Sequence, residues 1–316
     1  MPHRHEKKLL EKAIRKTVTL LEKKYPGREV VLLTDREELA CTACRQIREP
    51  AELDRPVDQI ILIPYFANDE DYAEALSEIK KIGAAFYALP LYHPAASYRH
   101  RDRLAETALR RVERDVLIHG LKHFDENDFQ NLMQAIEITR EIEGDYLEIG
   151  VFTGTSGLAA LYYMEAAGIY RRSYFMDTFE GFTYPEALES MDLHWRGGHR
   201  LSGPEANLKR VSDLFSRFSL PVRIIRGNIC RVPLPEAIQA IAVCNVDVDL
   251  YDAVSAALQK VAPCISRHGI IVAEDSGHTP ALGGALLATR EFLQSPAGKA
   301  FIPVYLESGQ TFLIKK

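Results

Sequence analysis

The sequence has no excess of positive charge, no long apolar run and no secretory signal, and each absence excludes a class of protein. Its 44 acidic residues outnumber its 39 basic residues, so the formal net charge is -5 and we expect no nucleic-acid partner. No stretch approaches the roughly 18 apolar residues that a membrane span requires, and we expect no span. The first residues, MPHRHEKKLLEKAIRK, carry no apolar segment after their charges. These features predict a cytoplasmic protein.

Cysteine is scarce as well, at five residues: Cys41, Cys44, Cys230, Cys244 and Cys264. An odd, scattered set without a secretory signal favours reduced thiols over disulfides. The Cys41-x-x-Cys44 spacing fits half of a zinc site or a redox pair, but no second such pair completes it. Because Cys44 stands in a charged stretch that we expect to be helical, the sequence favours an incidental spacing.

What the sequence does contain is typical of a globular protein. Hydrophobic residues make up 47% of the 316 positions and charged residues 26%, and the length favours two units. We predict a smaller α/β domain over residues 1–110 and a larger one over residues 120–316, with the boundary between about residues 95 and 122. In the first domain we expect two helices, 6–24 and 69–81, and three strands, 29–33, 60–63 and 84–89.

The second domain alternates strands and helices more strongly, which predicts a Rossmann-like, mostly parallel sheet. Two strands around Glu307-Ser308-Gly309 predict a C-terminal antiparallel hairpin. The expected strands are 145–149, 173–176, 222–225, 240–246, 269–273, 301–305 and 311–314. The expected helices are 126–141, 154–167, 208–218, 253–261 and 286–293. In such sheets the ligand lies beyond the carboxyl ends of the strands, so residues that follow strands become site candidates.

A glycine-rich turn follows the first of these strands. Strand 145–149 runs into Gly150, Gly154 and Gly157, then into a helix whose N-terminal N–H groups are free. The spacing is neither the dinucleotide fingerprint nor a P-loop. Glu148 suits a cationic amine such as the methionine end of S-adenosylmethionine, although a turn of this kind is as often purely structural.

Two further strand ends extend this constellation. Asp177 ends the next strand, where a carboxylate can accept hydrogen bonds from ribose hydroxyls. Arg226-Gly227-Asn228 follows another strand and fits either an adenine pocket or a plain turn.

The sharpest feature is an acidic cluster. Asp247 and Asp249 end an apolar strand on one face, about 7 Å apart along the strand, and Glu274-Asp275 ends the next strand. Like charges at one sheet edge are costly without a cation or water. Oxygen ligands favour Mg²⁺, Mn²⁺ or Ca²⁺ over zinc, and the alternative is a set of solvated strand ends.

Together these segments resemble the macrocin O-methyltransferase family, class I S-adenosylmethionine-dependent enzymes that act on sugar hydroxyls. The matching segments are Glu148–Gly150, Met176–Phe182, Asp247–Tyr251 and His268–Asp275, and the traceable resemblance covers about residues 120–316. Glu274 departs from the family's Asp-Asp pair but remains a hard oxygen ligand. The resemblance implies a class I methyltransferase fold, and it suggests a homo-oligomer as a possible partner state.

The resemblance also implies roles for individual residues. Asp249 would be the general base, and Asp247, Glu274 and Asp275 would hold Mg²⁺ or another divalent cation. The expected cofactor-binding residues are Glu148, Gly150, Thr153, Gly154, Thr155, Ser156, Asp177, Thr178, Gly227, Asn228 and Asp247.

The long polar segment from Tyr184 to Pro204 follows the cofactor strand, as lids often do. We expect Trp195, the single tryptophan, to stack on a sugar or ring, and His194 or His199 to assist proton transfer. An incidental surface loop is the alternative.

We therefore predict a Mg²⁺-assisted, S-adenosylmethionine-dependent O-methyltransferase that acts on a hydroxyl of a sugar or glycosylated small molecule. A binding or scaffold protein with a degenerate methyltransferase domain is one alternative, and an NAD-dependent sugar-modifying enzyme is another. The first domain could serve acceptor recognition or oligomerisation.

Overall fold

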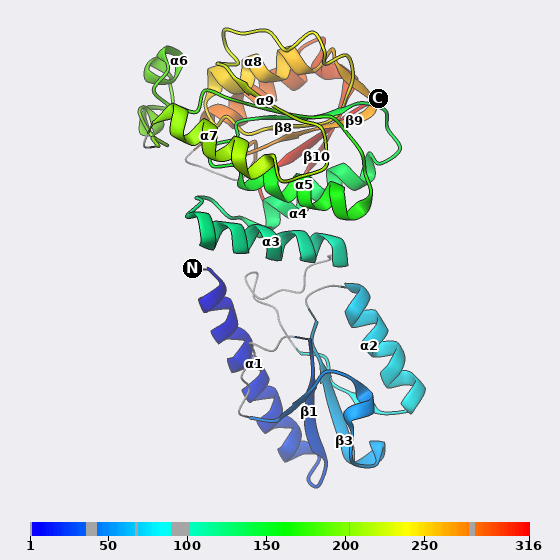
Figure 1. Cartoon of the computed structure of the whole chain (residues 1–316). Helices are drawn as coiled ribbons and strands as arrows, with labels where there is room; N and C mark the ends of the chain where they lie inside the picture. Colours follow the sequence, from blue (N-terminus) through cyan, green and yellow to red (C-terminus); the bar gives the residue numbers. More distant parts are fainter. Residues whose placement is uncertain (1, 36–42, 67–68, 90–101, 202, 278–281) are drawn as a thin grey trace. The chain divides into compact units, whose positions relative to one another are not determined.

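The computed structural model describes residues 2–35, 43–66, 69–89, 102–201, 203–277 and 282–316 (Figure 1). The chain divides into two compact units, Met1–Glu106 and Thr107–Lys316, each with its own sheet.

The first unit is a small α/β sandwich. Its sheet has the order β2-β1-β3-β4, and all of its strands are parallel. Its elements are α1 (Pro2–Lys24), β1 (Glu29–Leu33), β2 (Arg45–Ile47), the 3₁₀ turns η1 (Pro50–Glu52) and η2 (Val57–Gln59), β3 (Ile60–Pro64), α2 (Asp69–Ile82) and β4 (Ala85–Phe86).

Both faces of this sheet are buried, because alternate side chains of its central strands pack against different helices. Val30 and Leu32 of β1 pack with α1, while Val31 and Leu33 pack with α2. A parallel strand covered on both sides reads as a continuous apolar run, which is why EVVLL and IILIP are recognisable in the sequence.

The second unit is larger and carries a seven-stranded sheet. Its helices are α4 (Glu126–Ile138), α5 (Thr155–Ala167), α6 (Pro185–Glu189), α7 (Pro204–Phe215), α8 (Tyr251–Val261) and α9 (Gly283–Gln294). Helix α3 (Arg103–His119) crosses the division between the units, and two short 3₁₀ helices are η4 (Leu193–Trp195) and η6 (Gly298–Ala300). Its strands are β5 (Asp145–Ile149), β6 (Ser173–Asp177), β7 (Val222–Arg226), β8 (Ile241–Val246), β9 (Ile265–Ala273), β10 (Phe301–Tyr305) and β11 (Thr311–Lys315).

The strand order is β7-β6-β5-β8-β9-β11-β10. The five strands from β5 to β9 are parallel, and β11 is antiparallel to both β9 and β10. The order reverses between β5 and β8, so the carboxyl ends of these two strands form the switch point at which doubly wound sheets bind ligands. The predicted mostly parallel sheet with a C-terminal hairpin is confirmed.

Helices cover both faces of this sheet. Helices α8 and α9 pack on one face against Leu147, Met176 and Val246. On the other face α4 packs against β8 and β9, and α7 packs against β7. Helix α5 is buried almost all round, so it shows no amphipathic pattern.

Several sequence expectations needed correction. We expected Cys44 in a helix, but it directly precedes β2, a short edge strand that we missed, and Cys41 lies outside the described residues. Strand β4 is shorter than the expected 84–89, and β9 begins four residues earlier than expected. None of the described helices is both long enough and apolar enough to cross a membrane.

Candidate active site

A cavity of about 340 Å³ lies at the carboxyl ends of strands β5, β6, β7, β8 and β9. The loop before α4 and the segment after β6 also contribute to its wall. Among the predicted site residues, those that line the cavity are Gly150, Thr155, Ser156, Asp177, Thr178, His199, Gly227, Asn228, Asp247, Asp249, Glu274 and Asp275. Glu148, Thr153, Gly154 and His194 are not among its lining residues.

The glycines of the turn after β5 serve two different purposes. Gly150 has a φ of 96°, and a Cβ there would lie 1.7 Å from the backbone oxygen of Asp247. Only glycine therefore allows β5 and β8 to approach at the switch point. Gly157 instead packs against aromatic rings, since a Cβ would lie 2.6 Å from Cζ of Phe215.

Asp177 holds the same turn from the neighbouring strand. Its Oδ2 accepts hydrogen bonds from the backbone N–H groups of Val151 (2.7 Å) and Phe152 (2.9 Å). Its Oδ1 accepts one from the N–H of Phe179 (2.6 Å). A carboxylate has about four acceptor sites, so one remains for a ligand hydroxyl.

Glu148 lies behind the cavity wall, with no exposed surface. Tyr146 Oη donates to its Oε2 (2.6 Å), and Ser156 Oγ donates to its Oε1 (2.9 Å). Burial raises the pKa of this carboxyl to about 7, and these two hydrogen bonds oppose the rise. Glu148 is therefore placed to support the start of α5 rather than to touch a ligand directly.

The turn after β7 closes the cavity on another side. Gly227 and Asn228 line it together with Ile229. The Asn228 amide is already engaged, because its Nδ2 donates to Glu186 Oε2 (2.9 Å) and its Oδ1 accepts from the Cys230 N–H (2.9 Å). These contacts fix the turn and leave an apolar surface toward the cavity.

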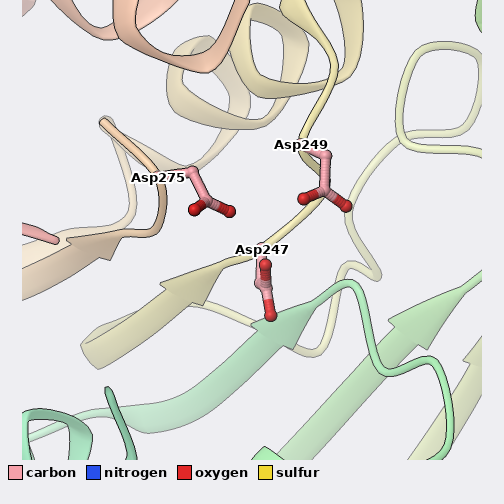
Figure 2. A group of neighbouring side chains, drawn as sticks. All are labelled: Asp247, Asp249 and Asp275. Atoms are coloured by element: carbon pink, nitrogen blue, oxygen red, sulfur yellow. The ribbon is translucent and has the colours of Figure 1, made fainter. Parts of the chain in front are cut away.

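Three carboxylates meet at the ends of β8 and β9. Asp247, Asp249 and Asp275 each offer one oxygen, and these oxygens lie within 4.8 Å of one another. Figure 2 shows the three side chains turned toward one shared space. Asp249 has a φ of 58° and Asp275 a φ of 52°, a left-handed backbone that aims both side chains inward.

The clustering perturbs the protonation of these acids. Burial, followed by the charge of Asp275, raises the pKa of Asp249 to about 8. Burial and the charges of Asp249 and Asp275 raise the pKa of Asp247. A divalent cation would relieve this repulsion, and three hard oxygens are the donors that Mg²⁺ prefers, so the residues present fit such an ion.

Glu274 stands slightly apart from this group. Its Oε1 accepts a hydrogen bond of 2.7 Å from Nε2 of Gln310, which directly precedes β11. The oxygen of Gln310 in turn accepts from Asn131 Nδ2 (2.7 Å). The group that converges is therefore Asp247, Asp249 and Asp275, whereas we expected Glu274 as a ligand and Asp249 as a base alone.

The segment after β6 is packed against the domain. Asp192 accepts hydrogen bonds from the N–H groups of Gly284 (2.9 Å) and Tyr251 (3.1 Å), at the first turns of α9 and α8. Trp195 and His199 reach the cavity with their rings stacked at 5.4 Å, whereas His194 contacts Trp195 edge-on.

Sequence reasoning missed three lining residues in particular: His123, Asp128 and Phe152. Asp128 follows the N-cap Asp125 of α4, and burial and the charge of Asp125 raise its pKa to about 7. The acidic residues at the N-cap and in the first turn of α4 were a usable signal for Asp128. Nothing in the pattern distinguished His123 or Phe152 from ordinary loop residues.

The strand order, the antiparallel insertion of β11 and the site at the switch point define a class I methyltransferase fold. The family model described as Macrocin-O-methyltransferase (TylF) matches residues 67–295. The chain belongs to this family, and the match begins well before residue 120, where we had placed the start of the resemblance.

The chain is also similar to individual proteins. The chain is 32% identical over 170 residues to an 8-demethyl-8-(2,3-dimethoxy-alpha-L-rhamnosyl)-tetracenomycin-C 4'-O-methyltransferase of Streptomyces olivaceus. That alignment covers 49% of this chain and 60% of the relative. Among solved structures, the O-methyltransferase NovP matches 60% of this chain and 79% of its own, with a TM-score of 0.48 and 19% identity. The calicheamicin methyltransferase CalS11 matches 68% and 94%, also with a TM-score of 0.48 and 19% identity.

Proposed function

We propose that this protein is an S-adenosylmethionine-dependent O-methyltransferase that methylates a hydroxyl of a sugar attached to a small molecule, with help from a divalent cation. The observation that carries the proposal is the carboxylate group Asp247, Asp249 and Asp275 in the same cavity as Asp177 and the Gly150 turn. Hydride transfer to NAD has no need of such a group, and the dinucleotide fingerprint is absent from the turn.

The cofactor would lie across the switch point. Asp177 would accept a hydrogen bond from a ribose hydroxyl at its remaining acceptor site, while it keeps the turn in place through Val151 and Phe152. The apolar surface beside Gly227 would face the adenine. Glu148, Thr153 and Gly154 would act through the turn and the start of α5, since they do not line the cavity.

The cation would be held by the three aspartates. When bound, Mg²⁺ stabilises negative charge on an acceptor oxygen, and the cofactor offers an electrophilic methyl group. Asp249 would also take the hydroxyl proton. It belongs to the acidic group, and its left-handed turn beyond β8 directs its carboxylate toward the space that the three aspartates share. His199 stands near enough to Asp177 and Asp275 to feel both charges, so it would border the transfer site.

The acceptor class follows from the relatives. The Streptomyces olivaceus relative is named for methylation of a rhamnosyl group, and the family is named for the O-methylation of macrocin. A glycosylated natural product is therefore the acceptor to test first.

The deciding experiment is a calorimetric titration of S-adenosylhomocysteine, with and without Mg²⁺. We expect micromolar binding that Asp177→Ala weakens by roughly 30- to 100-fold, because a charged hydrogen-bond partner and the anchor of the turn are lost together. Asp213→Asn, on the exposed face of α7, is the matched control.

Absence of binding to the wild type would reject a methyltransferase and favour a degenerate binding domain. Binding without methyl transfer to any hydroxylated acceptor would favour a scaffold protein instead.

A further inference from the structure

Three aromatic rings from three separate segments meet at the cavity wall. His123 comes from the loop before α4, Phe152 from the turn after β5, and His199 from the segment after β6. Their ring centroids lie 5.4 Å apart for His123 and Phe152, 5.4 Å for His123 and His199, and 5.1 Å for Phe152 and His199. We call these three residues the ring triangle.

All three residues have a left-handed backbone, with φ values of 59° for His123, 48° for Phe152 and 52° for His199. This conformation is unfavourable for bulky side chains and persists only where the surroundings impose it. Seven non-glycine residues in the described part of the chain have positive φ, and six of them line this cavity. Such strain gathers at ligand sites, which sets the triangle apart from ordinary core packing.

Hydrogen bonds and close packing fix the backbone of the three segments that carry these rings. Thr153 Oγ1 donates to the carbonyl of Lys122 (2.8 Å), which joins the Phe152 turn to the His123 loop. Asn207 Nδ2 donates to the carbonyl of Phe152 (2.9 Å). Gly181 packs so closely beneath His199 that a Cβ there would lie 2.4 Å from the His199 backbone oxygen.

The triangle is extended by two further rings. Trp195 stacks on His199 at 5.4 Å and 16°, and Phe182 meets it edge-on at 4.8 Å. Five aromatic side chains therefore form one wall of the cavity. This wall is largely apolar, whereas the strand ends contribute carboxylates. A wall of this kind offers flat apolar faces for a ring, with few polar groups to fix its orientation.

His199 supplies such a polar group. Burial, and then the charges of His123 and Lys122, lower its pKa, so the imidazole is neutral near pH 7. A neutral imidazole has one nitrogen that donates and one that accepts a hydrogen bond. It also avoids repulsion with a cationic cofactor next to Asp177.

We propose that the ring triangle is the acceptor-binding wall of the active site, where a pyranose ring packs its C–H face against Phe152 and His123 while His199 hydrogen-bonds one of its hydroxyls. The inference rests on the proposed function. It commits to a single sugar ring as the group recognised, and it makes His199 a specificity-determining residue rather than the base.

The test uses the full chain with S-adenosylhomocysteine and Mg²⁺ bound, and methyl α-L-rhamnopyranoside as the probe. Saturation-transfer NMR with irradiation of the aromatic protons should label the ring C–H protons of the probe. His199→Phe keeps the ring but removes both nitrogens, and should weaken probe binding by about tenfold, the effect of one lost hydrogen bond. His199→Asn tolerates the left-handed backbone but removes the ring, and should weaken it further.

His268→Phe is the matched control, since His268 also has a left-handed backbone (φ 65°) but lies in the exposed first half of β9. Affinity for S-adenosylhomocysteine should change less than twofold in all three variants. In turnover assays the loss should appear in KM for the glycoside, with kcat nearly unchanged.

Three results would overturn the inference: no saturable pyranoside binding to the wild type, equal probe binding by wild type and both His199 variants, or a parallel loss of cofactor affinity in those variants. Failure of the wild type to bind S-adenosylhomocysteine would instead count against the proposed function, so the two failures are distinguishable.

Discussion

The two ends of the seven-stranded sheet are built from the same strands but differ in chemistry. At the amino end, the basic side chains are bound by oxygen atoms: Arg172 Nε lies 2.9 Å from Asp145 Oδ1, and Arg171 donates to the carbonyls of Ile142 (2.7 Å) and Gly144 (2.8 Å). At the carboxyl end, three aspartates gather instead, and their oxygens lie within 4.8 Å of one another.

Backbone strain divides the same way. Six of the seven left-handed non-glycine residues in the described chain line the carboxyl-end cavity, and the seventh, His268, lies in the first half of β9. Each such residue costs on the order of 1–3 kcal/mol. The amino end is thus arranged for stability, while the carboxyl end accepts repulsion and strain that a ligand can relieve. Substitutions at the two ends should accordingly affect different observables.

The largest effect should come from Asp249→Asn at the carboxyl end. Loss of the general base should lower kcat by about 10³-fold. Affinity for S-adenosylhomocysteine should stay within twofold, because Asp177 and the Gly150 turn are untouched. Calorimetry and a methyl-transfer assay on a glycosylated acceptor measure the two quantities.

Asp252→Asn is the control, since Asp252 is exposed in the first turn of α8 and does not line the cavity. A parallel Mg²⁺ titration separates the two roles of Asp249. If saturating Mg²⁺ restores turnover in Asp249→Asn, the residue is a ligand and not the base.

At the amino end, Arg171→Met should act on stability alone. The side chain is 5% exposed and donates to carbonyls from the chain around residues 139–144. Its removal leaves these partly buried carbonyls without the hydrogen bonds that Arg171 supplies, which should lower the free energy of unfolding by roughly 2–4 kcal/mol. Urea unfolding monitored by circular dichroism measures this change.

Arg223→Met removes the same kind of side chain from an exposed position on β7, and should cost less than about 0.5 kcal/mol. The folded fraction of Arg171→Met should retain the wild-type affinity for S-adenosylhomocysteine. A loss of that affinity would contradict the prediction that the amino end of the sheet contributes to stability alone.

Much of the fold was predictable because a buried strand or helix has a recognisable pattern of apolar residues in the sequence. Strands β1, β5 and β8 are covered on both faces, and mostly apolar segments mark β1 (EVVLL) and β8 (IAVCNV) in the sequence. Strand β5 (DYLEI) carries two acids, yet it was predicted with its bounds correct. Strand β2 was missed because three residues at a sheet edge bury too little to leave a pattern. Helix α7 begins at Pro204, earlier than we expected, where a proline in the first turn marks the start.

The site was predictable only where it follows the strands. Asp177, Asp247 and Asp275 were predicted to lie together because the carboxyl ends of parallel strands meet at one edge of a sheet, and all three line the cavity. His123 and Phe152 were not, because their approach depends on loop conformations with positive φ, which no periodicity records. The pairing of Glu274 with Gln310 depends on the register of β11, which the sequence does not specify.

The smallest predicted effect concerns Glu148, which lies directly beneath the carboxyl end. Its pKa rises from an ordinary value of 4.5 to about 7 in the folded protein because of burial, so folding favours the protonated form. Its contribution to stability is present in full below about pH 4.5 and is lost as the pH rises through 7. Between pH 5 and pH 8 this carboxyl alone should lower the free energy of unfolding by about 2 kcal/mol.

Glu148→Gln keeps the shape of the side chain without the charge, and should remove that share of the pH dependence. The variant should therefore be more stable than the wild type at pH 8 and nearly equal to it at pH 5. Glu143→Gln, at an exposed position before β5, should follow the wild type at both pH values. If Glu148→Gln loses as much stability with rising pH as the wild type does, the carboxyl is already charged in the folded state. The electrostatic repulsion among the carboxylates at the carboxyl end of the sheet would then include the buried Glu148 beneath the Gly150 turn.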